Sequence, residues 1–254
     1  MSVRKLLDLS GKVALVTGGS RGLGLQIAEA LGEMGAKLAI SARKKDELDA
    51  AVAHLGDAYA VVCDIGKRDA IRPLADAVLK KYGKVDILVN NAGATWGAPA
   101  EEHPLDAWDK LVSVNLSGLF ALTQIIARDS MIPAKWGRVI NVASIAGLLG
   151  QDPRFAPTAA YTATKHGVIG LTRQLAAEWG VHGITVNAIC PGFFPSKMTK
   201  HTLATVGEKV RDLTPNRRLG NDEDLKGLAV LLASEASRHI TGQAIAVDGG
   251  AVIV

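Results

Sequence analysis

Cysteine, aromatic residues and long apolar runs are all scarce in this chain of 254 residues. The two cysteines, Cys63 and Cys190, lie in apolar runs without a metal-binding or redox spacing. We therefore expect buried, reduced thiols and no metal site. No apolar stretch approaches the roughly 20 residues that span a bilayer, and the start of the chain does not resemble a signal peptide. These absences predict a cytoplasmic protein without a membrane partner.

Charge of one sign is not concentrated anywhere in the sequence. The 29 basic and 25 acidic residues leave a net charge of +4, and no basic block is present. A nucleic-acid partner is therefore not expected. The chain is long enough for one large domain, and its 27 glycines and 4% aromatic residues suit an α/β protein with tight turns between strands and helices.

The first ordered pattern is a strand, a glycine-rich turn and a helix. Residues 12–17 (KVALVT) form a short β-branched run typical of a buried parallel strand. Gly18, Gly22 and Gly24 follow, and residues 26–34 then have the pattern of a helix. Glycines allow the backbone to turn tightly beside a pyrophosphate, and a helix N-terminus offers free N–H groups. The pattern predicts dinucleotide binding, although many strand-to-helix turns use glycine for structural reasons alone.

The end of the second predicted strand indicates which dinucleotide binds. Residues 37–41 form this strand, and Ala42 occupies the place where NAD enzymes carry a carboxylate for the ribose hydroxyls. Arg43 comes next, and its guanidinium suits the 2′-phosphate of NADP. NADP(H) is thus favoured over NAD(H). The competing interpretation is a solvated basic start to the helix predicted at residues 44–54.

Strands and helices alternate to the end of the chain. Further strands are predicted at residues 58–63, 85–89, 138–142, 184–189 and 244–247, and further helices at residues 67–82, 106–127, 159–180 and 221–233. Such alternation is typical of one doubly wound, seven-stranded parallel sheet with helices on both faces. Asn221 is expected to cap the last helix. No linker, repeat or low-complexity tract divides the chain.

Tyr161 and Lys165 carry the chemistry that the pattern suggests. Positions i and i+4 share one face of a helix, so the phenol and the ammonium can enter one pocket. A nearby cation favours the phenolate and lowers the pKa of tyrosine, which can then exchange a proton with a substrate oxygen. Taken alone, the pair is better explained as two amphipathic helix residues; the surrounding motifs change that balance.

These motifs together resemble the short-chain dehydrogenase/reductase family over about the entire chain. The resemblance rests on Thr17 with the Gly18-x-x-x-Gly22-x-Gly24 turn, Asp64, the NNAG run at residues 90–93, Asn115, Ser144, Tyr161-x-x-x-Lys165 and the Pro191-Gly192 segment. It implies a single Rossmann-fold, NADP-binding domain over residues 1–254. It also implies an oxidoreductase that moves a hydride between nicotinamide and a small-molecule carbonyl or alcohol.

The resemblance assigns a catalytic set and a cofactor set. Ser144 would position the substrate carbonyl, Tyr161 would pass it a proton, Lys165 would hold the nicotinamide ribose and lower the pKa of Tyr161, and Asn115 would kink its helix and order a water. Asp64 would contact the adenine; a helix N-cap is the other interpretation of this residue. The cofactor-binding residues would be Gly18, Ser20, Arg21, Gly22, Leu23, Gly24, Arg43, Asp64, Ile65, Asn91, Ala92, Gly93, Tyr161, Lys165, Pro191, Gly192, Phe194 and Ser196. Ser196 stands where the family carries a threonine, and Asp222 stands where it often carries a proline.

The substrate is less well specified. Ser144 and Tyr161 are 17 residues apart, longer than is usual in the family, and residues 146–158 are expected to form a loop at the pocket mouth. Residues 196–212 are a candidate lid. The predicted substrate contacts are apolar: Trp96, Phe155, Phe193 and Met198. They favour a ketone or 3-oxoacyl substrate over a sugar acid.

Two likenesses within the family compete. Residues 193–199 resemble bacterial gluconate 5-dehydrogenase-like members, and with residues 91–97 they also resemble NADPH-dependent 3-oxoacyl reductases, including the one tied to rhamnolipid synthesis. A third alternative, from another class, is a catalytically silent NADP-binding regulatory module. Family likeness further implies a homotetramer that pairs through the long helices and the C-terminal strand.

Overall fold

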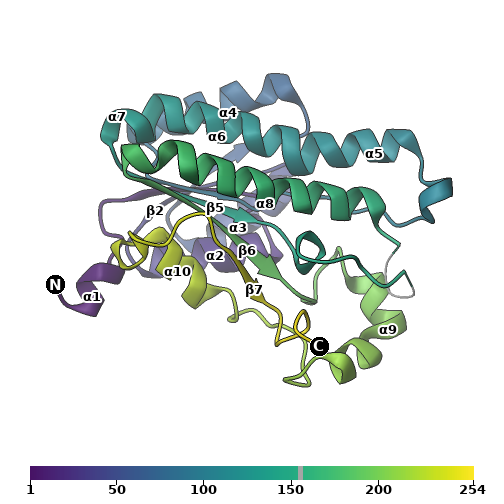
Figure 1. Cartoon of the computed structure of the whole chain (residues 1–254). Coiled ribbons are helices and arrows are strands. Elements are labelled where there is room, and N and C mark those ends of the chain that lie inside the picture. The colour runs from purple at the N-terminus through teal and green to yellow at the C-terminus, as the bar shows by residue number, and fades with distance from the viewer. Residues whose placement is uncertain (154–156) are drawn as a thin grey trace.

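Seven short strands lie side by side in one parallel sheet in the computed structural model of the chain, which describes residues 1–153 and 157–254 (Figure 1). They are β1 (Val13–Thr17), β2 (Lys37–Ala42), β3 (Ala58–Val62), β4 (Ile87–Asn90), β5 (Gly137–Val142), β6 (Ile184–Pro191) and β7 (Ala244–Val247). Their order is β3-β2-β1-β4-β5-β6-β7, and every neighbouring pair is parallel. The predicted doubly wound α/β fold is confirmed. The chain reverses its direction of winding between β1 and β4, the place where open α/β sheets bind ligands.

Helices cover both faces of this sheet. They are α1 (Val3–Leu7), α2 (Gly22–Glu33), α3 (Lys45–Leu55), α4 (Arg68–Tyr82), α5 (Leu105–Val112), α6 (Leu119–Ile126), α7 (Ile132–Ala134), α8 (Ala159–Trp179), α9 (Lys200–Leu213) and α10 (Lys226–Ala233). Figure 1 shows α4, α5 to α7 and α8 on one face, and α2, α3 and α10 on the other. The α9 helix stands beside the C-terminus, outside the sheet.

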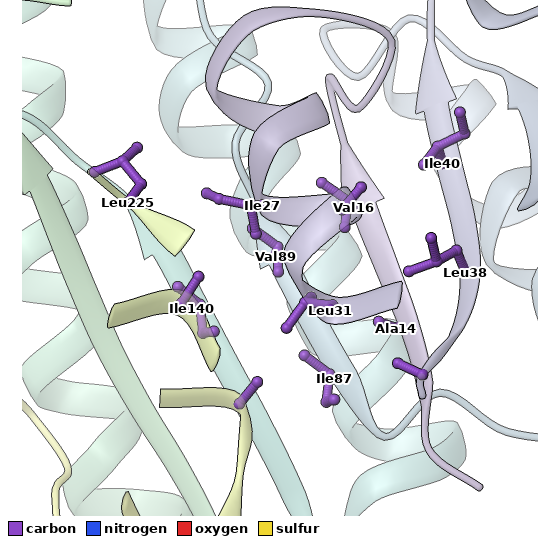
Figure 2. Packing of buried hydrophobic residues seen from close by; sticks show 14 of the residues in the cluster. Ala14, Val16, Ile27, Leu31, Leu38, Ile40, Ile87, Val89, Ile140 and Leu225 are labelled. Carbon is purple, nitrogen blue, oxygen red and sulfur yellow. The ribbon is translucent and has the colours of Figure 1, made fainter. Parts of the chain in front are cut away.

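Successive strand residues point to opposite faces, and this alternation builds two cores. Val16 and Val89 pack with Ile27 of α2 on one face (Figure 2). Leu15 and Leu88 point the other way, into the core beneath α4, α6 and α8. Strands buried on both faces need apolar residues throughout, which explains the continuous apolar runs of the sequence.

One helical rod runs from Leu105 to Ala134 along the sheet. Two π-helical segments, Ser113–Gly118 and Ala127–Met131, interrupt its α-helical pattern. By length and mean hydropathy (1.4) this rod could cross a membrane, contrary to the expectation from the apolar runs. However, 44% of its most apolar window is buried, and residues such as Leu122 and Ile126 fill the core. Packing within the fold therefore accounts for part of its apolar character.

Three predicted helix boundaries were wrong: the helix expected at residues 106–127 continues to Ala134, and two other helices start elsewhere than expected. The last helix begins at Lys226 and not at Asn221, because Asn221 forms a turn in which its Oδ1 accepts from the Glu223 N–H at 2.9 Å. Its own N–H donates to Asp224, whose carboxylate also binds Arg218. Helix α2 begins at Gly22, four residues earlier than predicted, because the glycine turn leads directly into it.

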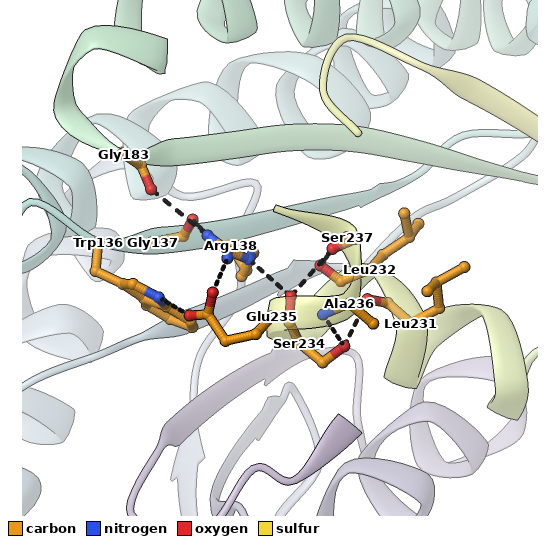
Figure 3. A network of polar contacts seen from close by, with 10 residues as sticks. All are labelled: Trp136, Gly137, Arg138, Gly183, Leu231, Leu232, Ser234, Glu235, Ala236 and Ser237. Carbon is orange, nitrogen blue, oxygen red and sulfur yellow. Dashed lines mark hydrogen bonds and ion pairs between the residues drawn. The ribbon is translucent and has the colours of Figure 1, made fainter. Parts of the chain in front are cut away.

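A buried arginine anchors the amino end of β5, at the edge opposite the glycine turn (Figure 3). Arg138 is 2% exposed, and its Nε donates to the Ser234 carbonyl at 3.1 Å. Glu235 lies 3.6 Å from its guanidinium and accepts from the Trp136 indole. Lys12 Nζ lies 3.4 Å from the centroid of the Trp136 ring. These contacts tie the end of α10 to the base of the sheet, so that its carboxyl edge remains available for function.

Candidate functional site

The glycine turn after β1 is fastened to the loop after β4. Asn91 Nδ2 donates to the carbonyls of Thr17 and Gly18 at 2.9 and 3.1 Å. The Thr17 hydroxyl in turn accepts from the backbone N–H groups of Asn91 and Ala92. Gly24 lies against this junction, because a Cβ there would come within 2.3 Å of Asn91 Nδ2 and of the Gly18 carbonyl. The fingerprint glycine is therefore required by close packing of α2 on the junction.

A chain of amides holds the central strands together. Asn90 Nδ2 donates to the Thr123 hydroxyl at 2.8 Å and to Asn141 Oδ1 at 2.9 Å. Asn141 Nδ2 continues to the Thr172 hydroxyl on α8 at 2.9 Å. All four side chains are buried. The first asparagine of the NNAG run thus links β4, β5 and two helices, which fixes α8 and its Tyr161 relative to the sheet.

Asn115 lies within the first π-helical segment, where the wider turn sets it off the regular α-helical pattern. Its Oδ1 accepts from the Ala94 N–H at 2.8 Å, and its Nδ2 donates to the Ala94 carbonyl at 3.0 Å. The same Nδ2 donates to the Thr164 hydroxyl at 3.1 Å, and that hydroxyl donates to the Tyr161 carbonyl at 2.8 Å. Asn115 therefore connects the loop after the NNAG run to the first turn of α8.

Ser144 and Tyr161 meet at the carboxyl end of β5. Ser144 caps a short 3₁₀ turn, Ile145–Gly147, and its Oγ accepts from the Ala146 N–H at 3.1 Å. Burial raises the pKa of Tyr161, while a hydrogen bond with the Ser144 hydroxyl acts in the opposite direction and lowers it. Although 17 residues separate them in sequence, the two hydroxyls are neighbours in the fold.

Lys165 lies beside Tyr161 and is only 5% exposed. Its Nζ lies 5.6 Å from the centroid of the Tyr161 ring and donates to the Val142 carbonyl at 2.7 Å. Burial lowers the pKa of Lys165 to about 8. The expected lowering of the Tyr161 pKa is thus not found, because burial raises this pKa by more than the hydrogen bond from Ser144 lowers it. The two side chains do lie close together, as their i, i+4 spacing predicts.

The second cysteine borders this pocket. Cys190, near the end of β6, is fully buried, and Cys63 is 6% exposed. Burial raises the pKa of each thiol to about 11, so both are protonated at neutral pH. Both are free, as the sequence predicted. Within the described residues, no three His, Cys, Asp or Glu side chains converge as a metal site would require.

The predicted basic residues lie beside the carboxyl ends of β1 and β2. Arg21 occupies the N-cap position of α2, and its Nη1 lies 2.6 Å from Glu47 Oε1 on the first turn of α3. Arg43 is exposed in the bend after β2. Asp64 follows β3 and accepts from the Gly66 N–H at 3.1 Å. It is not an N-cap, because Lys67 holds that position of α4.

The segment after β6 is held by side chains that the family resemblance assigns to the cofactor. Phe194 is 4% exposed, belongs to the core under α2 and α10, and packs on Gly220. Its side chain therefore anchors the loop, which leaves only its backbone for a ligand. The Ser196 hydroxyl lies 3.0 Å from the Thr199 hydroxyl, and each accepts from the other residue's N–H. In this structure Ser196 is thus engaged in a turn before α9.

The predicted substrate residues are only partly brought together. Trp96 and Met198 are 49% and 42% exposed. Phe193 lines a cavity of about 60 Å³ together with Asp248 and Gly249, near the C-terminus. Phe155 lies outside the described residues. The loop that carries Trp96 is paired with the segment before α8, because the Ala98 N–H donates to the Pro157 carbonyl at 2.9 Å.

Sequence reasoning missed two residues of this site, Thr164 and Glu47, and gave no contact to Thr17, which it had named only as part of the motif. Thr17 receives two N–H groups of the NNAG run, Thr164 joins Asn115 to Tyr161, and Glu47 binds Arg21. Thr164 is three residues after Tyr161 and one before Lys165, which could have marked it. No sequence signal connects Glu47 to the glycine turn 26 residues earlier.

Comparisons with known proteins agree with this geometry. The family model described as short chain dehydrogenase matches residues 12–207. A gluconate 5-dehydrogenase of Gluconobacter oxydans is 39% identical and covers 100% of this chain and 99% of its own. A 3-oxoacyl-[acyl-carrier-protein] reductase of Synechocystis is 38% identical, with coverages of 96% and 98%. The crystal structure of a gluconate 5-dehydrogenase from Burkholderia cenocepacia in complex with NADP and tartrate is 33% identical and superposes with a TM-score of 0.93, over 100% of both chains.

Proposed function

Because the chain belongs to the short chain dehydrogenase family, we propose that it is an NADP(H)-dependent carbonyl reductase and alcohol dehydrogenase acting on a ketone or 3-oxoacyl substrate. The observation that carries the proposal is the group of Ser144, Tyr161, Lys165 and Asn115 at the carboxyl edge of the sheet, in which Lys165 and Asn115 are buried and the other two are half-buried. A hydrogen-bonded phenol and a desolvated lysine at the carboxyl edge of the sheet suit proton transfer to a carbonyl oxygen.

The chain around the glycine turn fits a dinucleotide. A Cβ at Gly93 would come within 3.9 Å of Lys165 Nζ and 3.5 Å of Asn115 Oδ1, so glycine keeps open the space in front of both. Gly22, at φ 53°, has open space where its side chain would be, at the N-terminus of the 12-residue helix α2. This arrangement suits a pyrophosphate. We assign the cofactor contacts to the residues named from the sequence, with Phe194 contributing its backbone.

In the proposed reaction, bound NADPH supplies the hydride, and the protein supplies orientation and a proton. Ser144 donates a hydrogen bond to the carbonyl oxygen and holds it beside the Tyr161 hydroxyl. Tyr161 then gives its proton to that oxygen. Lys165 holds the nicotinamide ribose with its ammonium, and Asn115 keeps the loop at Ala94 and the first turn of α8 in register.

Preference for NADP(H) over NAD(H) is supported by charge at the end of β2. Arg43 is exposed there, Arg21 reaches the same edge, and Ala42 leaves no carboxylate for the ribose hydroxyls. A guanidinium can bind a 2′-phosphate with two parallel hydrogen bonds. The NADP complex among the similar structures supports the same preference.

A ketone or 3-oxoacyl substrate is supported by the apolar side chains of Trp96 and Met198, which are exposed on the loop after the NNAG run and on the segment after β6. A sugar acid is the alternative, because a gluconate 5-dehydrogenase is as similar to the chain as a 3-oxoacyl reductase. Purified protein with NADPH or NADH and a panel of 3-oxoacyl thioesters, aryl ketones and 5-ketogluconate discriminates between them. Oxidation of NADPH by 5-ketogluconate alone would reverse the assignment. Tight NADPH binding without turnover of any carbonyl would instead favour a silent regulatory module.

The catalytic role of Tyr161 has its own test. Tyr161→Phe removes the hydroxyl while keeping the ring, so NADPH binding should remain nearly unchanged. Turnover should fall by about two to four orders of magnitude, the contribution of a positioned general acid. Fluorescence titration measures the binding, and consumption of NADPH measures the turnover. Substantial residual turnover in this variant would contradict the role.

We further propose that residues 1–254 act as one cytoplasmic domain that assembles into a homotetramer. Continuity of the seven-stranded sheet through β7 supports one domain, and the two protonated thiols suit a reducing compartment. Exposed large apolar residues support assembly; they are Leu105, Trp108 and Phe120 on the long helical rod, and Ile253 and Val254 at the C-terminus.

A further inference from the structure

Three cations from three separate segments surround one carboxylate at the edge of the site. Glu47 Oε1, on the first turn of α3, lies 2.6 Å from Arg21 Nη1 and 3.2 Å from Lys197 Nζ. Lys44 Nζ lies 3.7 Å from the same oxygen. Partial burial would raise the pKa of Glu47, but the hydrogen bond from Lys197 and the charges of the three cations lower it.

The contact with Lys197 spans the site. Lys197 follows β6, whereas Glu47 follows β2, and β1, β4 and β5 lie between these two strands in the sheet. The side chains meet although 150 residues separate them in sequence. The segment after β6 therefore reaches over the carboxyl ends of the central strands, where the glycine turn and the NNAG loop lie. Lys197 joins the substrate side of the cleft to its adenosine side.

Fold stability does not explain this contact. The Lys197 side chain is 67% exposed, and an ion pair of that exposure contributes less than about 1 kcal/mol. The turn before α9 is already held by the mutual hydrogen bonds of Ser196 and Thr199. What the contact does achieve is to place a third cation beside Arg21 and Lys44, in reach of one anionic oxygen.

We propose that Lys197 is a specificity-determining residue that binds the 2′-phosphate of NADP together with Arg21, and that Glu47 holds both cations in place before the phosphate arrives. This inference rests on the proposed preference for NADP(H). A phosphate monoester carries close to two negative charges at neutral pH and has three acceptor oxygens, so it attracts these cations more strongly than one carboxylate does. A bound 2′-phosphate then fastens the segment after β6 across the cleft, which a dinucleotide without the 2′-phosphate cannot do.

The test uses the full chain and the adenosine halves of the two cofactors. Calorimetric titration with 2′,5′-ADP and with 5′-AMP compares the wild type with Lys197→Gln. A matched control is Lys200→Gln, which removes the same charge from an exposed lysine three residues away that forms no ion pair with Glu47 among the described residues. Lys197→Gln should bind 2′,5′-ADP about fivefold more weakly, as expected for one charge-assisted hydrogen bond, and 5′-AMP as the wild type does. Lys200→Gln should match the wild type for both ligands.

Hydrogen–deuterium exchange supplies a second readout that is independent of affinity and turnover. In the wild type, 2′,5′-ADP should slow exchange in residues 196–203 more than 5′-AMP does. In Lys197→Gln this difference should disappear. If 2′,5′-ADP protected residues 196–203 equally in the wild type and in Lys197→Gln, the inference would be overturned.

Arg21→Gln separates failure of the inference from failure of the proposed function. A wild type that binds both ligands equally would overturn the NADP(H) preference and the role of Lys197 together. If Arg21→Gln weakens 2′,5′-ADP binding and Lys197→Gln does not, the preference stands and the role of Lys197 is wrong. An equal loss for both ligands in Lys197→Gln would also overturn it, because the lysine would then act on the whole cleft.

Discussion

Burial of the Lys165 ammonium group carries a cost in folding free energy. The group is bonded to one carbonyl, and burial lowers its pKa from 10.5 to about 8. The unfolded chain therefore holds this proton more tightly than the folded protein does between these two values. By linkage, this group destabilises the fold at pH 7 and does so less as the pH rises from about 8 towards 10.5. Keeping a charged Lys165 in the site therefore lowers the free energy of unfolding at neutral pH.

Lys165→Met should reveal this cost through pH. Relative to the variant, the wild type should gain on the order of 2 kcal/mol in free energy of unfolding between pH 7 and pH 9.5. Urea unfolding of both proteins at the two pH values measures the gain. Lys200→Met, on the exposed start of α9, controls for the loss of a charge. A constant difference between wild type and Lys165→Met across this range would contradict the assigned pKa.

Thr164 is a small residue with a connecting role. Its hydroxyl accepts from Asn115 and donates to the Tyr161 carbonyl, in a place that is 2% exposed. Thr164→Val keeps the shape and removes both bonds, which leaves buried polar atoms short of partners. We expect a loss of about 1–2 kcal/mol in stability and a lower kcat with little change in NADPH affinity.

The hydroxyl of Thr164 can be tested separately from its methyl group. Thr164→Ser retains the hydroxyl and should recover most of the kcat, while Thr162→Val makes the same change on α8 without breaking a hydrogen bond among the described residues. Steady-state kinetics and thermal unfolding measure the two effects. Equal activity in Thr164→Val and wild type would show that the link to Asn115 does not hold Tyr161 in place.

At the scale of elements, the packing of α2 on the loop after β4 decides whether the glycine turn can form. Gly24→Ala would bring a methyl group within 2.3 Å of Asn91 Nδ2 and of the Gly18 carbonyl. We expect a loss of about 3 kcal/mol in the free energy of unfolding, together with weaker NADPH binding. Chemical denaturation and fluorescence titration measure the two quantities.

Gly170→Ala is the matched control for this element. Gly170 lies on an exposed side of α8, with no atom within 4 Å of its Cβ position. Alanine should raise stability there by about 0.5–1 kcal/mol through helix propensity. If the two substitutions had equal effects, close packing of α2 would not explain Gly24.

The π-helical segment around Asn115 shows a feature of the helix that the sequence pattern predicted only in part. Asn115 was expected to disturb its helix, and it lies in the π-helical segment Ser113–Gly118. Gly118, in the same segment, approaches Ile65 so closely that a Cβ would lie within 2.1 Å of the Ile65 carbonyl oxygen. That approach depends on how the rod lies on the loop after β3, which residue spacing alone does not contain.

At the scale of the whole molecule, the rod from Leu105 to Ala134 faces two environments. Its inner residues fill the core, while Leu105, Trp108 and Phe120 remain 79%, 40% and 39% exposed. Large apolar side chains on one element favour burial against another copy of the chain. The proposed homotetramer would cover them.

Phe120→Glu tests that assembly. A carboxylate buried between copies is unfavourable, so the variant should sediment as a smaller species than the wild type. Val62→Glu makes a comparable change at an exposed position of the edge strand β3 and should leave the assembly unchanged. Analytical ultracentrifugation measures both. Wild-type mass for Phe120→Glu, or a monomeric wild type, would contradict the proposal.

Prediction from the sequence was most successful where a local pattern has one physical solution. Continuous apolar strands can only be buried on both faces, and a turn with Gly18, Gly22 and Gly24 leads into a helix, so the fold class and the pairing of Tyr161 with Lys165 followed from spacing. The prediction of helix boundaries failed where a side chain and the backbone compete for the same hydrogen-bond partners. Asn221 can cap a helix or form a turn, and its bonds with Glu223 and Asp224 decided for the turn.

The sequence by itself determined the parallel α/β sheet, the position of the proposed site at its carboxyl edge, and the residue types to which the proposed chemistry is assigned. Only the tertiary structure decided that Lys165 bonds to Val142, that Phe194 points into the core, and that Lys197 crosses three strands to Glu47. The reason is physical. Periodicity and turn chemistry act between neighbours in the chain, whereas desolvation and ion pairing depend on which distant segments the fold brings into contact.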